Sequence, residues 1–79
     1  MEALVEIASK AIADYGFRQV VLWSPEDVLA QWGLSESEAQ VLQGPMRRAL
    51  ESMPVPVEPA NIPDEQRRMA AMIENALGS

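Results

Sequence analysis

The chain has 79 residues, of which 48% are hydrophobic, and twelve acidic residues against six basic ones give a net charge of −6. This length allows one small domain with a thin core, and the lack of Cys and His excludes disulfide bonds and the usual zinc ligands. Six basic residues are too few for a nucleic-acid or anionic-membrane footprint, and no apolar run approaches the roughly 20 residues of a membrane span.

The first segment, residues 2–15, has the pattern of an amphipathic helix. Leu4, Ile7 and Ile12 fall on one stripe at helical spacing. Gly16 follows directly, and glycine enters the left-handed conformation that ends many helices at little cost. We therefore expect this helix to end at Gly16.

The next segment, residues 17–23, is ambiguous between strand and helix. Its β-branched pair, Val20 and Val21, favours a strand. The sequence offers no second strand-like segment to pair with it, and a lone strand leaves its backbone groups without hydrogen bonds. A short helix is the preferred interpretation.

Ser24 begins the clearest helix signal in the sequence. Serine is a favoured N-cap, Pro25 suits the first helical position, and Asp27 stands three residues after the cap, as in a capping box. Gly33 is well placed to end this helix in the left-handed conformation.

A second capping box follows at once, with Ser35 as the cap and Glu38 three residues later. The apolar stripe of this helix continues across Gly44 and Pro45. Because proline removes a backbone donor and clashes with the preceding turn, we expect a kink or a restart here. A restart, with Gly44 as cap and Pro45 as first residue, fits best.

Residues 54–63 contain four of the six prolines and predict a semi-rigid spacer. The last segment, residues 64–79, predicts an amphipathic helix. Its apolar stripe consists of Met69, Met72, Ile73, Ala76 and Leu77. Placed after a spacer, this helix either delivers its stripe to a partner's groove or folds back over its own bundle.

The fold class that follows is all-α. We expect a compact cluster of four to five short helices over residues 1–53, a Pro-rich linker over residues 54–63, and a C-terminal amphipathic helix over residues 64–79.

The sequence indicates no catalytic chemistry. Without His and Cys, the common nucleophile–base arrangements cannot form. The carboxylate pairs, Glu26 with Asp27 and Glu36 with Glu38, stand at predicted helix starts, where negative charge stabilises the helix dipole. We expect neither an enzyme nor a bound cofactor or metal. The first residues lack the pattern of a secretory signal, so a cytoplasmic location is the default.

Two kinds of side chain indicate binding. Trp23 and Trp32 either fill the core or act as exposed anchors, since tryptophan is enriched at interface hot spots. Methionines on apolar stripes either fill core gaps or form adaptable binding surfaces. The predicted partner-binding residues are Trp23, Trp32, Met69, Met72, Ile73 and Leu77.

Residues 4–50 resemble a known group of small helical proteins. The matching elements are Phe17–Gln19, Ser24–Leu29 and Trp32–Glu38. They are similar to the small helical α subunit of protocatechuate-type extradiol ring-opening dioxygenases, and to the related nitrile-hydratase-like leader peptide small proteins. Ser24 stands where those families usually have Asp, and the chain lacks a Gly-Gly or Gly-Ala site followed by a Cys- or Thr-rich core.

The resemblance implies an all-helical fold. It further implies either an accessory subunit that covers a metal-holding catalytic partner, or a leader that a modifying enzyme reads. It transfers no catalytic residue. We therefore expect a non-catalytic helical accessory subunit or interaction module that packs on a larger protein. The alternatives are a leader-bearing precursor peptide recognised by a tailoring enzyme and a small homo-oligomer. We expect no nucleic acid, membrane or metal partner.

Overall fold

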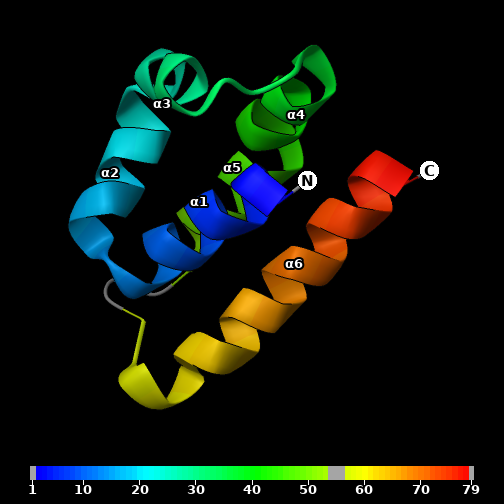
Figure 1. Ribbon diagram of the computed structural model, residues 1–79. Coiled ribbons are helices and arrows are strands. Elements are labelled where there is room, and N and C mark those ends of the chain that lie inside the picture. Colours follow the sequence, from blue (N-terminus) through cyan, green and yellow to red (C-terminus); the bar gives the residue numbers. More distant parts are fainter. Residues whose placement is uncertain (1, 54–56, 79) are drawn as a thin grey trace.

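The computed structural model describes residues 2–53 and 57–78, and these residues form helices and no strand (Figure 1). The all-α prediction is confirmed. The elements are α1 (Glu2–Ala13), α2 (Tyr15–Trp23), α3 (Pro25–Trp32), α4 (Glu36–Val41), a π-helical turn η1 (Leu42–Met46), α5 (Arg47–Ser52), a 3₁₀ turn η2 (Pro59–Asn61) and α6 (Ile62–Gly78).

The junction of α1 and α2 differs from the prediction. Helix α1 ends at Ala13, and Gly16 lies inside α2 rather than ending α1 in a left-handed conformation. The break is made by Asp14, whose backbone is extended (φ −127°, ψ 106°). Its carboxylate Oδ1 accepts a hydrogen bond of 3.3 Å from the N–H of Phe17. A side-chain cap at the start of α2 therefore replaces the glycine stop at the end of α1. The preference for a helix over residues 17–23 is confirmed.

The bounds of α3 are as predicted, but one of its caps works differently. Gly33 ends the helix in the left-handed region at φ 60°. Ser24 occupies the N-cap position, yet its side chain makes no cap hydrogen bond. Ser24 also ends α2, since its N–H donates to the carbonyl of Val20 at 2.8 Å. This double role holds its ψ at 55°, outside the usual N-cap range, and the N–H of Asp27 donates instead to the backbone carbonyl of Ser24.

At the start of α4 the predicted capping box is confirmed. The hydroxyl of Ser35 accepts from the N–H of Glu38 at 3.2 Å, and the carboxylate of Glu38 accepts from the N–H of Ser35 at 2.9 Å. The predicted restart at Gly44–Pro45 is wrong. The helix continues through Pro45 by widening into the π turn η1, so that α4, η1 and α5 follow one another without a cap. Such a turn accommodates the missing N–H and the proline ring.

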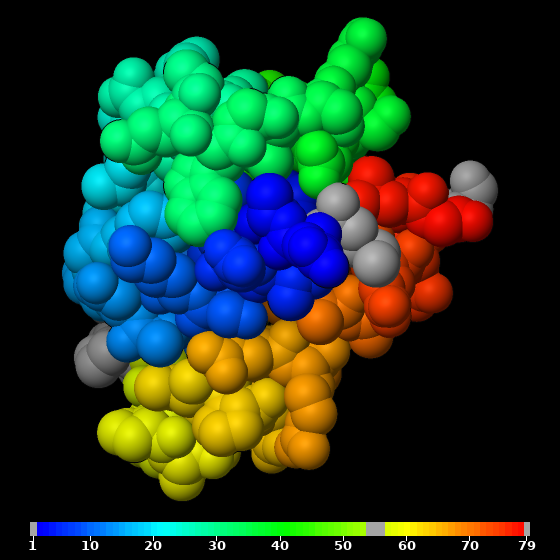
Figure 2. Space-filling view, viewed as in Figure 1, coloured from blue at the N-terminus to red at the C-terminus, as the bar shows by residue number. Residues whose placement is uncertain are grey.

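Helix α6 folds back along α1. In Figure 1 it runs beside α1, on the opposite side of the molecule from α2, and Figure 2 shows its side chains against those of α1. The amide of Gln66 ties the two helices together by donating to the carbonyl of Ser9 at 3.0 Å. Met69 and Ile73 of α6 belong to the same buried cluster as Leu4 and Ile7 of α1. Residues 2–53 and α6 therefore share one core.

The buried apolar side chains come from every α-helix, from the π turn η1 and from Val57, two residues before η2. They are Leu4, Ile7, Ala8, Ala11, Ile12, Val21, Val28, Val41, Leu42, Met46, Leu50, Val57, Met69 and Ile73. Of the predicted spacer, residues 54–56 lie outside the described part of the chain. Val57 is buried, Glu58 is the N-cap residue of η2, and residues 59–63 form η2 and the first two residues of α6.

The two N-cap serines provide a matched test of local stability. We expect Ser35→Ala to lower the free energy of unfolding by about 1 kcal/mol, because the N–H of Glu38 loses its partner. We expect Ser24→Ala to change it by less than about 0.5 kcal/mol, because no cap hydrogen bond is lost. Urea titration followed by circular dichroism measures both values. Equal losses for the two variants would contradict the assignment.

The shared core predicts the effect of a charge at Ile73, which is fully buried. We expect Ile73→Asp to unfold α1 together with α6, because an unpaired carboxylate would lie between them. We expect the milder Ile73→Ala to cost about 2–5 kcal/mol. Circular dichroism and urea titration measure these effects. A variant that loses only the helical signal of α6 would show that the N-terminal helices fold without it.

Candidate functional site: exposed apolar surfaces

The six predicted partner-binding residues lie in different environments. Met69 and Ile73 are 3% and 0% exposed and belong to the core, so a partner could reach almost none of their surface. Trp32, Met72 and Leu77 are partly buried and pack against that core. Trp23 is 75% exposed.

A groove of about 370 Å³ runs between α5 and α6. Apolar side chains line part of it, among them Met53 from α5's C-terminal cap and Met69 and Met72 from α6. The other lining residues are Ala49, Ser52, Glu65 and Arg68. The structure thus brings two of the predicted methionines together in one groove.

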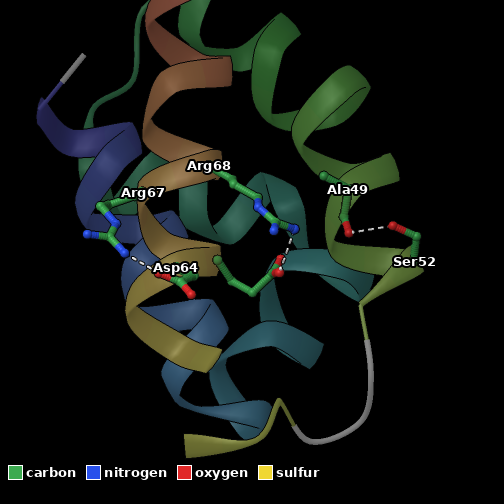
Figure 3. A network of polar contacts seen from close by, with 6 residues as sticks. Ala49, Ser52, Asp64, Arg67 and Arg68 are labelled. Atoms are coloured by element: carbon green, nitrogen blue, oxygen red, sulfur yellow. Dashed lines mark hydrogen bonds and ion pairs between the residues drawn. The ribbon is translucent and has the colours of Figure 1, made fainter. Parts of the chain in front are cut away.

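The charged side chains of α6 near this groove form ion pairs with residues of the same helix. Figure 3 shows Arg68 extending from α6 toward α5, with its guanidinium 3.2 Å from the carboxylate of Glu65. Arg67 points to the other side of α6 and pairs with Asp64. On α5, the hydroxyl of Ser52 donates to a backbone carbonyl one turn earlier at 2.9 Å. Such solvent-exposed pairs contribute little stability and leave little net charge at the groove.

Leu77 lies apart from these methionines, in a second groove of about 380 Å³ between α4 and α6. Its other lining residues are Ser37, Gln40, Val41, Pro45 and Ala76. More polar than apolar surface lines this groove, so it offers a weaker apolar contact than the groove between α5 and α6.

Among the residues that the structure describes, the exposed large hydrophobic side chains lie on α2. Trp23 is 75% exposed, and Val20, one helical turn earlier, is 45% exposed. The indole N–H of Trp23 donates to the side-chain oxygen of Gln19, one turn earlier in α2, at 2.7 Å. Val20 also lines an open hollow of about 540 Å³ between α2 and α3, together with Asp27, Ala30 and Gln31. We define the α2–α3 face as Val20, Trp23, Asp27, Ala30 and Gln31.

Of this face, only Trp23 was predicted to bind a partner. The sequence did hold a signal for Val20, because residues 20–23 are four consecutive apolar residues in a helix. A helix buries one stripe, so four apolar residues in a row cannot all face the core. Here Val21 points inward at 2% exposure while Val20 and Trp23 point outward. Ala30 and Gln31 carry no comparable signal.

The two tryptophans should differ in their effect on stability. We expect Trp23→Ala to change the free energy of unfolding by less than about 0.5 kcal/mol, because the ring is already in water. We expect Trp32→Ala to cost about 2 kcal/mol, because its ring packs against the core. Urea titration of both variants gives the comparison. A loss at Trp23 as large as at Trp32 would show that Trp23 supports the fold.

Metal binding, membrane insertion and similarity to known proteins also bear on function. Among residues 2–53 and 57–78, no group of three or more acidic side chains is placed to hold a metal ion. No helix in the same ranges has the length and hydropathy to cross a membrane. Neither protein-family models, curated proteins nor solved structures give a significant match to this chain. The resemblance to the dioxygenase small subunit stays a prediction.

Proposed function

We propose that the protein is a non-catalytic, cytoplasmic interaction module that docks on a larger protein through the α2–α3 face. The single observation that carries the proposal is the exposure of Trp23. Tryptophan is one of the residue types enriched at energetic hot spots, where truncation to alanine costs about 2 kcal/mol or more of binding free energy. Because Trp23 is 75% exposed, most of its side-chain surface is still in contact with water and can be buried by a partner.

The indole N–H of Trp23 already has a hydrogen-bond partner on its own helix, the side-chain oxygen of Gln19. A hydrogen bond that restrains the ring before contact lowers the side-chain entropy that is lost when a partner covers it. The neighbouring hollow beside Val20 offers a recess for a side chain of the partner. Protein interfaces often pair such a protruding side chain, here Trp23, with a neighbouring recess, here the hollow beside Val20.

The positions of the carboxylates support the non-catalytic part of the proposal. Glu26 and Asp27 are exposed in the first turn of α3, where negative charge favours the helix dipole. Glu38 is engaged in the capping box of α4. These acidic side chains thus have structural roles at the surface. General acid–base catalysis uses carboxylates in a sheltered cleft, which is a different setting.

The α2–α3 face is a better candidate than the C-terminal helix for a structural reason. The apolar stripe of α6 already contributes Met69 and Ile73 to the core. A partner that took this stripe would have to displace α6 from α1 and leave α1 uncovered. Trp23 and Val20 are available without any rearrangement.

Chemical cross-linking in native cells, followed by mass spectrometry, tests the proposal. We expect a cross-linked protein that is recovered with the wild type and with Met72→Ala, and that is lost with Trp23→Ala. Trp23→Ala removes the exposed anchor, whereas Met72→Ala alters the groove between α5 and α6 and serves as the matched control. Recovery of the same protein with Trp23→Ala would refute the α2–α3 face as the docking site.

A further inference from the structure

Positive and negative charges are segregated along the chain. Between residues 11 and 46 the only basic residue is Arg18, and its side chain is buried at 1% exposure. The exposed charges on α2, α3 and the turn before them are therefore all negative, from Asp14, Glu26 and Asp27. The other basic residues lie on α1, α5 and α6. Helices α2 and α3 and the turn before them thus add exposed negative charge and no exposed positive charge of their own. Lys10 of α1 reaches α2 near the end opposite Trp23, with its Nζ 4.7 Å from the centre of the Phe17 ring.

The chemistry of the exposed ring narrows the class of ligand. Because the indole N–H of Trp23 already donates to Gln19, the ring offers a partner mainly its carbon surface, which includes the π face. This face attracts apolar side chains and cations, and tryptophan forms the strongest cation–π contacts. Asp27 lines the hollow next to Val20, so a carboxylate stands beside the apolar contact. Both features favour a positively charged side chain.

We propose that the α2–α3 face binds a basic, amphipathic segment of another protein, which places an apolar side chain against Val20 and Trp23 and a Lys or Arg near Asp27. This inference rests on the proposed function and specifies its partner. A net charge of −6 also steers such a segment toward the protein before contact.

Charge complementarity disfavours two other occupants. In a symmetric pair of this chain, the same face of each copy would oppose the other. Glu26 and Asp27 of both copies would then lie at one interface, to which α2 and α3 bring no exposed cation, and like charges across an interface are unfavourable. A nucleic acid or an anionic lipid surface carries the same sign of charge as this face.

Selection from a library of random peptides tests the class of ligand even while the partner protein is unidentified. The full-length protein serves as bait, and Trp23→Ala removes binders that do not use the anchor. We expect the remaining peptides to share Lys or Arg within a few positions of a bulky apolar residue. Selected peptides rich in Asp or Glu, or a selection that leaves no Trp23-dependent peptide, would overturn the inference.

Two variants of Gln31 then test how much the negative charge of the face contributes to peptide affinity. Gln31 is exposed and lines the hollow, so its replacement changes the charge of the face without disturbing the core. We expect Gln31→Lys to weaken binding of a selected basic peptide about fivefold and Gln31→Glu to strengthen it, with both effects reduced in high salt. Ala71→Lys is the control, because it adds the same charge at an exposed position of α6, which lies on the other side of α1 from α2. Equal affinity for Gln31→Lys and Gln31→Glu would refute the charge complementarity.

The outcomes separate the inference from the function on which it rests. A cross-linked protein lost with Trp23→Ala but insensitive to Gln31→Lys would leave the docking face in place and overturn the basic partner. A concentration-dependent dimer that Trp23→Ala abolishes, measured by analytical ultracentrifugation, would replace the foreign partner with a second copy of this chain.

Discussion

The packing of α6 against α1 is the contact on which the rest of this structure depends. A chain of 79 residues without disulfides has little apolar surface to spare. Helix α6 supplies Met69 and Ile73 to the same cluster that Leu4 and Ile7 supply from α1. The apolar stripe that looks from the sequence like a docking helix is thus used to complete the fold.

The packing of α2 determines which apolar side chains are left exposed for a partner. Helix α2 directs Val21 and the buried Arg18 inward, and Arg18 donates from Nε to the carbonyl of Ala11 at 3.4 Å. A buried arginine of this kind fills space with its aliphatic stem while its polar end meets the backbone. With the inward positions of α2 occupied, Val20 and Trp23 face solvent. The same division leaves an apolar anchor on a pair of helices, α2 and α3, that adds exposed negative charge and no exposed positive charge.

The sequence predicted local structure better than long-range packing. The helical class, the capping box at Ser35 and the left-handed Gly33 all follow from short-range backbone chemistry, and all are confirmed. The errors at Gly16 and Pro45 are local as well. At Gly16 and at Pro45 the chain can end or continue a helix in two ways that both satisfy the backbone hydrogen bonds. Residue propensity alone does not decide between them. Asp14 supplied a side-chain cap instead of a glycine stop, and a π turn accommodated the proline without a restart.

The candidate site was predictable only in part, because exposure depends on which helices meet. Trp23 was identified by residue type, but its exposure follows from the direction of α2 relative to α1 and α3. The role of Met69 and Ile73 depended on whether the chain after the prolines turns back, which helical periodicity does not encode. Asp27 was identified as a helix-start residue, and only the adjacency of α2 and α3 places it in a hollow with Val20.

Native-state hydrogen exchange measured by NMR tests most directly whether α6 is part of the core. If α1 and α6 share one core, their slowest amides exchange only through global unfolding, with the same free energy in both helices. That coincidence is the result we expect. Slow exchange in α1 together with much faster exchange along α6 would show that α6 detaches while the rest stays folded, and the stripe of α6 would then be free for a partner.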